Sequence, residues 1–82
     1  MNYQKHYDLL IERGRSRKLE GHKELHYVVP SCLGGSNEKS NIVELTPSEH
    51  YVAHQLLVKL YPENAMIAYA AVNFLVDSQR EN

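Results

Sequence analysis

Two stretches of the sequence decide the fold, ELHYVVP at residues 24–30 and NIVELTPSEHYVAH at residues 41–54. The first is rich in β-branched and aromatic side chains and stops at a proline, which predicts a short strand. The second opens with IVEL at residues 42–45, which predicts another short strand. Because the turn-forming run LGGSN at residues 33–37 lies between them, the two strands are expected to pair as an antiparallel hairpin with a long loop.

The residues after the second strand predict the start of a helix. Thr46 is a favourable N-cap, Pro47 suits the first helical position, and Glu49 stands where a capping box places a carboxylate. The helix is expected to run to about Leu60, because Pro62 blocks its continuation. Strand, strand and helix therefore follow one another directly along the chain.

Helices are predicted on both sides of this core. Aromatic and apolar residues at helical spacing predict a helix over residues 3–13, which Gly14 would end as a left-handed C-cap. A last helix is predicted over residues 63–79. It has apolar residues on nearly all of its faces: Ala65, Met66, Ile67, Ala68, Tyr69, Ala70, Ala71, Val72, Phe74, Leu75 and Val76. A helix that buries one stripe in a small domain needs fewer apolar residues than this. The pattern therefore predicts a homodimer or a docking partner that covers the rest.

The length and composition of the chain predict one small domain over residues 1–82. A chain of this length buries only about 60% of its unfolded surface, so additional stabilisation by a disulfide or a metal is common. Cys32 is the only cysteine and cannot form an internal disulfide, which makes a bound metal an attractive alternative tie. No apolar stretch follows the N-terminus, so neither a signal peptide nor a membrane span is predicted, and a cytoplasmic location is expected.

Three of the five histidines are placed to share one metal ion. His50 and His54 are four residues apart on the capped helix, so both imidazoles project from one face. The hairpin can bring His26 against them, and three protein ligands leave coordination positions open, as in a catalytic metal site. The alternative is less specific: histidine pairs at this spacing also arise by chance, and His26 could be a half-buried strand residue bonded to a neighbour.

The same stretches resemble the HNH endonuclease motif of small phage-encoded nucleases. That pattern reads roughly E-x-H-H-I-x-P, a Gly-Gly-Ser-Asn loop, N-(I/L)-V-x-L-T and E-H-(F/Y)-x-A-H. This chain has ELHYVVP, GGSN, NIVELT and EHYVAH in the same order. The histidines nine and thirteen residues after Asn41 also resemble the colicin DNases. The resemblance extends from about Tyr3 to Pro62, with Tyr7, Ile11 and Arg13 fitting its leading helix.

The resemblance implies a fold and a ligand set. The fold would be α+β, a ββα-metal (His-Me finger) core over residues 24–60 with flanking helices. His26, His50 and His54 match the positions that hold one divalent ion, such as Mg²⁺, Mn²⁺, Ni²⁺ or Zn²⁺. Asn41 matches the middle asparagine, which ties down the loop between the strands and holds the base-bearing strand in place.

Tyr27 departs from the family pattern. By the resemblance, this position holds the histidine that acts as the general base. An imidazole with a pKa near 6.5 is largely neutral at pH 7, whereas a phenol with a pKa near 10 is almost wholly protonated. Losing a general base typically costs on the order of 10²–10⁴-fold in rate. Tyr27 is either a natural variant with a weakened or altered mechanism, or an introduced substitution that disarms a nuclease toxic to its host.

The basic residues gather in one part of the chain although the formal net charge is −1. Residues 13–23 contain Arg13, Arg15, Arg17, Lys18 and Lys23. A local basic stripe can neutralise phosphates, so these residues are candidates for contacts to the DNA backbone with low sequence specificity. The alternative is a solvated connector after a helix.

The sequence therefore predicts a metal-dependent endonuclease or nickase, a hydrolase of DNA phosphodiester bonds in a phage-infected host cell. The alternative is a catalytically inactive, nuclease-derived module that binds DNA or regulates. A third hypothesis, a zinc-stapled interaction domain that uses the apolar last helix, accounts less well for the Gly-Gly-Ser-Asn loop.

Overall fold

The computed structural model describes the backbone of residues 1–80 and the side chains of residues 1–73. Its elements are α1 (Tyr3–Arg15), β1 (Glu24–Tyr27), β2 (Ile42–Leu45), α2 (Pro47–Leu60) and α3 (Ala65–Arg80). Two short 3-10 turns, η1 (Ser31–Leu33) and η2 (Lys39–Asn41), lie in the loop between the strands. The described chain is thus α+β, with one two-stranded antiparallel sheet. No helix in this part is long and apolar enough to cross a membrane.

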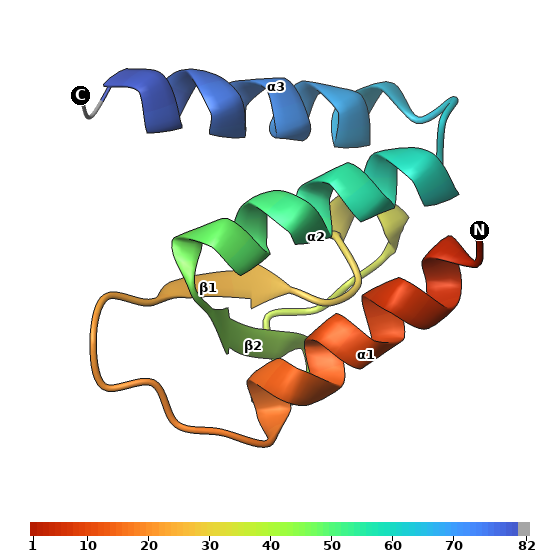
Figure 1. Cartoon of the computed structure of the whole chain (residues 1–82). Helices are drawn as coiled ribbons and strands as arrows, with labels where there is room; N and C mark the ends of the chain where they lie inside the picture. The colour runs from red at the N-terminus through yellow and green to blue at the C-terminus, as the bar shows by residue number, and fades with distance from the viewer. Residues whose placement is uncertain (81–82) are drawn as a thin grey trace.

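The helices are arranged around the hairpin. Figure 1 shows α2 between the hairpin and α3, with α1 running beside β2 and α2. The buried core lies where these elements meet, and α1, β2, α2 and α3 all contribute to it: Tyr7, Leu10, Ile11, Val43, Leu45, Ala53, Leu57 and Ile67. The core is therefore built around the strand–strand–helix unit that the sequence predicts.

The hairpin is shorter on its first strand than the sequence predicts. β1 ends at Tyr27, opposite Ile42, rather than at Pro30. Beyond that point Val28 N donates to the Asn41 carbonyl at 2.9 Å, and Val29 N donates to Asn41 Oδ1 at 2.9 Å. At Val29 the Asn41 side chain thus takes the place of a backbone partner, which ends the ladder early.

The hairpin loop uses its two glycines for different reasons. Gly34 ends the η1 turn at φ 91°, a left-handed conformation that residues with a side chain rarely adopt. A Cβ atom on Gly35 would lie only 1.6 Å from the Val29 carbonyl oxygen. The sequence predicts a turn here, and the structure adds that no larger residue fits at Gly35 without moving the backbone.

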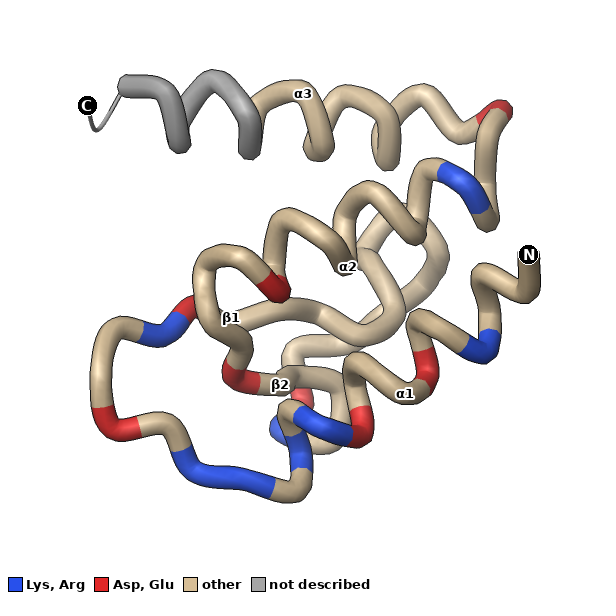
Figure 2. The backbone as a smooth tube through the Cα atoms, in the orientation of Figure 1, with Lys and Arg blue, Asp and Glu red and all other residues tan. Residues whose placement is uncertain are grey.

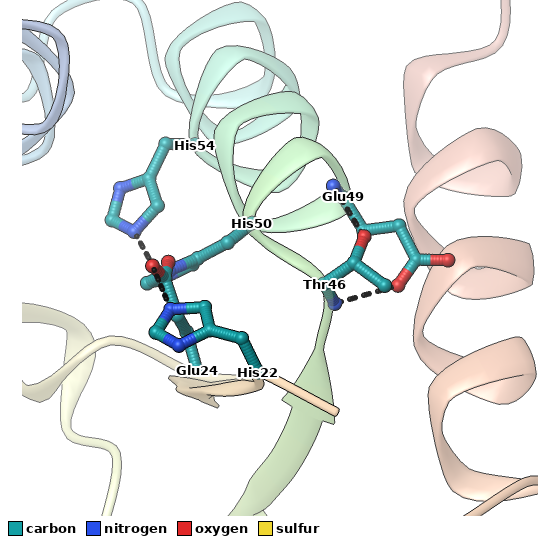
Figure 3. A network of polar contacts seen from close by, with 6 residues as sticks. All are labelled: His22, Glu24, Thr46, Glu49, His50 and His54. Carbon is teal, nitrogen blue, oxygen red and sulfur yellow. Dashed lines mark hydrogen bonds and ion pairs between the residues drawn. The ribbon is translucent and has the colours of Figure 1, made fainter. Parts of the chain in front are cut away.

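The start of α2 follows the predicted capping box. Thr46 Oγ1 accepts from Glu49 N at 3.2 Å, and Glu49 Oε1 accepts from Thr46 N at 3.0 Å (Figure 3). Pro47 occupies the first turn, and the helix ends at Leu60. Thr46 is the only residue between β2 and α2, so the box fixes where the helix begins and the direction in which its side chains project.

The prediction that Gly14 ends α1 is wrong. The helix continues to Arg15 and is capped at Ser16, with Gly14 buried inside its last turn. A Cβ atom at Gly14 would lie 2.6 Å from Val43 Cγ2 and 2.9 Å from Leu45 Cδ2. Glycine is therefore used here for the close approach of α1 to β2, not for a left-handed cap.

The last helix begins later than predicted, at Ala65 rather than Glu63, because Asn64 caps it by accepting from Ile67 N at 3.1 Å. Ile67 and Ala71 are buried, whereas Met66, Tyr69 and Val72 are 58–65% exposed. The described part of α3 therefore buries one stripe and leaves other apolar side chains in solvent. The predictions for Phe74, Leu75 and Val76 lie outside the described side chains.

Replacing Gly14 by alanine is expected to lower the free energy of unfolding by about 1–3 kcal/mol. Alanine has the better helix propensity by about 1 kcal/mol, but overpacking a close contact costs more. Gly21→Ala is the matched control, because a Cβ atom there meets nothing within 4 Å. Urea unfolding of both variants measures the difference, and equal or higher stability of Gly14→Ala would contradict the close packing.

Candidate metal centre

Three imidazoles from two elements converge at one point. His26 projects from β1, and His50 and His54 project from one face of α2 toward that strand. One ring nitrogen from each lies within 4.8 Å of the others. The ring centroids are 4.7–5.4 Å apart. The hairpin and the capped helix thus bring together the three histidines singled out in the sequence.

The His50 ring is oriented by a carboxylate. Its Nδ1 lies 2.7 Å from Glu24 Oε1, and because a carboxylate only accepts, Nδ1 carries the hydrogen. This bond lowers the pKa of Glu24. Figure 3 shows Glu24 reaching His50 from the strand side, with His22 on its other oxygen at 3.4 Å. Nε2 of His50 is then the ring nitrogen with a lone pair.

The His26 ring is buried, with 2% of its surface exposed. Burial first, and then the neighbouring rings of His50 and His54, lower the pKa of His26 to about 3. Its Nε2 lies 2.8 Å from the phenol oxygen of Tyr7, which also donates to the Val28 carbonyl at 2.7 Å. Burial raises the pKa of the Tyr7 phenol, so this group stays protonated.

The donor set fits a divalent ion. His54 Nε2 lies 3.1 Å from His50 Nε2, close to the separation of about 3.3 Å expected for two nitrogens bound tetrahedrally to one zinc ion at about 2.0–2.1 Å. Burial, and then His50, lower the pKa of His54 to about 4. Rings that are neutral at pH 7 present lone pairs, the form in which histidine ligates metals.

An open pocket adjoins the three imidazoles. It has a volume of about 330 Å³, and Leu25, His26, Tyr27, Pro30, Ser31, Asn37, His50, His54 and Leu57 line it. Tyr27 therefore shares a pocket with the histidines. Its hydroxyl donates to Asn37 Oδ1 at 2.8 Å. In this arrangement the phenol proton is directed at Asn37.

Asn41 lies at the base of the loop and contacts both of its sides. Its Nδ2 donates to the Val29 carbonyl at 3.0 Å and to the Ser36 carbonyl at 2.9 Å, while its Oδ1 accepts from Val29 N. Both polar atoms of the side-chain amide thus form hydrogen bonds. The chain before and after the two glycines is thereby joined through one side chain.

The basic stretch lies on the end of α1 and on the connector to β1 (Figure 2). Many of its cations contact the protein itself. Arg17 bonds to Glu49, Arg13 lies 4.0 Å from the same carboxylate, Lys23 lies 3.2 Å from Glu44 Oε2, and Arg15 donates to the Ser40 carbonyl at 3.0 Å. Arg17 lowers the pKa of Glu49 by its hydrogen bond. Lys18 is exposed to solvent.

A groove of about 620 Å³, called the basic groove below, lies beside this stretch. It is lined by Gly14, Arg15, Arg17, Leu25, Lys39, Ile42, Val43 and Glu44. Leu25, which is 59% exposed, lines both this basic groove and the histidine pocket. The two depressions are therefore neighbours on the surface.

Sequence reasoning missed Tyr7, Glu24 and Lys39 as members of these sites. Glu24 had a signal, because the family pattern begins with a glutamate two residues before the first histidine. The sequence places Tyr7 only in the leading helix, and its bond to His26 spans 19 residues. Lys39 lies in a polar loop where no local pattern sets it apart.

Several relatives of this chain come from a bacteriophage. It is 50% identical over 68 residues to "Probable mobile endonuclease E" of Enterobacteria phage T4, covering 82% of this chain and 48% of that protein. It is 42% identical over 79 residues to "Probable mobile endonuclease D" of the same phage, covering 90% of this chain and 30% of that protein. For "Probable mobile endonuclease B" the identity is 47% over 66 residues, covering 74% and 25%.

The chain thus spans less than half the length of these relatives. No family model matches the sequence. No solved structure matches it either.

With metal removed by a chelator, stability should fall as the pH is lowered from 7 to 5. Between about pH 3 and 6.5 the unfolded chain binds a proton at His26 that the folded chain excludes, so stability present above pH 6.5 is lost as the pH falls through that window. His26 alone contributes a loss of about 2 kcal/mol at pH 5, and His54 acts in the same direction.

Urea unfolding at pH 7 and pH 5 in excess chelator measures this loss. His26→Asn should show a shallower dependence on pH, whereas the exposed His6→Asn should keep the full one. Equal stability of the unmodified chain at the two pH values would contradict the burial of neutral imidazoles.

Proposed function

We propose that this chain is the nuclease domain of an HNH-type, metal-dependent DNA endonuclease. The convergence of three imidazoles beside an open pocket carries the proposal. The phage relatives named as mobile endonucleases support it, and they point to action in a phage-infected cell. The substrate would be a DNA phosphodiester, held by its backbone with low sequence specificity.

Each site residue has a role in this proposal. His26, His50 and His54 would hold one divalent ion, and Glu24 would fix the ring of His50. The ion would supply charge stabilisation at the scissile phosphate and the leaving oxygen. Asn41 would keep the loop next to Tyr27 in place through its contacts to Val29 and Ser36. The cleaved strand would enter the histidine pocket.

Tyr27 stands at the position of the general base and is poorly suited to it. Its hydroxyl donates a proton to Asn37 Oδ1 at 2.8 Å instead of presenting a base to water. To accept a proton from water it would first have to lose its own. We therefore propose that the chain keeps the fold and metal site of a nuclease but cleaves slowly.

A second candidate is a nuclease-derived module that binds DNA without cutting it. The hydrogen bond from Tyr27 to Asn37 favours this candidate, because the side chain at the base position is already engaged with the protein. The three converging imidazoles count against it, since drift after loss of catalysis would be expected to erode the ligands as well.

The basic groove would hold the DNA backbone in either case. Arg15, Arg17 and Lys39 line it, and Leu25 joins it to the histidine pocket. The cations that contact Glu44 and Glu49 are partly neutralised, so Arg15, Lys18 and Lys39 are the better candidates for phosphate contacts. The exposed apolar side chains of α3 would serve a second copy or a docking partner; two copies would cut both strands, and one would nick.

Tyr27→His is expected to raise the nicking rate on supercoiled plasmid by on the order of 10²–10⁴-fold. An imidazole can accept the proton of the attacking water at neutral pH. The assay uses Mg²⁺, Mn²⁺, Ni²⁺ and Zn²⁺ separately, with the double variant Tyr27→His, His50→Ala as the control for contaminating nuclease. No nicking by Tyr27→His in any metal would overturn the nuclease function and leave the binding module.

Lys39→Ala is expected to weaken DNA binding uniformly across sequences and to reduce the slope of log affinity against log salt by about 1. Lys59→Ala is the matched control, because Lys59 lies in the last turn of α2 and outside the basic groove. Fluorescence anisotropy with a labelled duplex in chelator measures both variants at several salt concentrations. An unchanged slope for Lys39→Ala would remove this groove from the DNA path.

A further inference from the structure

Tyr7 is a buried polar group in direct contact with the proposed metal site. Its side chain comes from α1, and 4% of the residue is exposed. The phenol oxygen lies 2.8 Å from His26 Nε2 and 2.7 Å from the Val28 carbonyl oxygen. The phenol and imidazole rings meet edge-on, with planes 72° apart. The oxygen thus stands between a ring nitrogen and a backbone carbonyl.

The positions of these three atoms decide which of them carry hydrogen. A carbonyl oxygen only accepts hydrogen bonds, and a phenol has one proton to give. At 2.7 Å the phenol must give that proton to Val28, because two oxygens without a hydrogen between them would repel. Toward His26 the phenol therefore presents a lone pair, and Nε2 of His26 must carry a hydrogen.

This assignment settles which nitrogen of His26 can bind a metal. A histidine that ligates a metal is neutral and has one N–H and one lone pair. With the hydrogen on Nε2, the lone pair is on Nδ1. We propose that Tyr7 is a positioning residue that holds His26 as the Nε2–H tautomer and so commits Nδ1 to the metal. The proposal rests on the proposed metal site, which it makes more specific.

The site then uses two different devices to orient its rings. Glu24 accepts from Nδ1 of His50, which leaves Nε2 for the ion. Tyr7 accepts from Nε2 of His26, which leaves Nδ1. Outer partners of this kind fix the tautomer and direction of a ligand ring, and removing them typically weakens metal binding by about 10–100-fold. A neutral phenol suits His26, because it adds no charge to the buried side of the site.

A purely structural role for Tyr7 makes a different prediction. The ring also packs in the core with Leu10 and Ile11, so its loss would lower stability in any case. If packing were its only role, Tyr7→Phe would leave the affinity for metal and the tautomer of His26 unchanged. A readout at the ring nitrogens therefore separates the two roles.

The first experiment measures Zn²⁺ affinity by competition with a chromophoric chelator. Tyr7→Phe keeps the ring and removes only the oxygen, and it should bind Zn²⁺ about 10–100-fold more weakly. Tyr69→Phe removes an exposed hydroxyl, and Ile11→Val perturbs the same core but keeps the Tyr7 hydroxyl; both should bind as the unmodified chain does. Unchanged affinity of a folded Tyr7→Phe would overturn the proposal.

The second experiment needs no variant. Nitrogen-15 NMR of the histidine rings in the metal-free chain at neutral pH should show His26 with hydrogen on Nε2. In the ¹¹³Cd²⁺-loaded chain the cadmium coupling should appear on Nδ1 of His26. Hydrogen on Nδ1, or coupling to Nε2, would overturn the proposal even if Tyr7→Phe failed to fold. A chain that binds no metal yet shows the Nε2–H tautomer would support the bond to Tyr7 and refute the proposed function instead.

Discussion

The burial of His26 between the hairpin and α2 is the constraint on which the rest of the structure depends. A ring with 2% exposure cannot be charged at low cost, and it needs a partner for its N–H. Side chains alternate along β1, so His26 faces the core while Leu25 and Tyr27 face outward. The capping box starts α2 immediately after β2, so that helix returns two further imidazoles to the same point. The interior and the candidate site are therefore the same region of the molecule.

Glu49 connects the local and the long-range parts of this arrangement. It caps α2 through Thr46 N and also bonds to Arg17, on the connector that follows α1. A carboxylate in the first turn of a helix is favourable on its own, because it faces the positive end of the helix dipole. The contact with Arg17 also shows why cations counted along a sequence overstate what is left for a phosphate, since part of that charge is used inside the protein.

The parts of the fold that local chemistry controls could be predicted from sequence. The bounds of β2 and α2 follow from β-branched residues, Thr46 and Pro62, and the i, i+4 spacing places His50 and His54 together. The predictions fail where contacts with distant segments of the chain determine the structure. β1 stops early because the Asn41 side chain intervenes, and Gly14 serves contact with Val43 rather than a cap. The bond of Tyr7 to His26 leaves no local pattern, because it joins α1 to β1 across the core.

The position of Tyr7 outside the strand–strand–helix unit has a consequence for modularity. All three imidazoles come from one short, continuous segment, so the loop that must close to gather them is small and its entropic cost modest. The atom that selects between the two nitrogens of His26 comes instead from α1. A protein engineer who transplanted only residues 24–60 into another scaffold would carry the three imidazoles across. A new hydroxyl would then be needed to keep the hydrogen on Nε2 of His26.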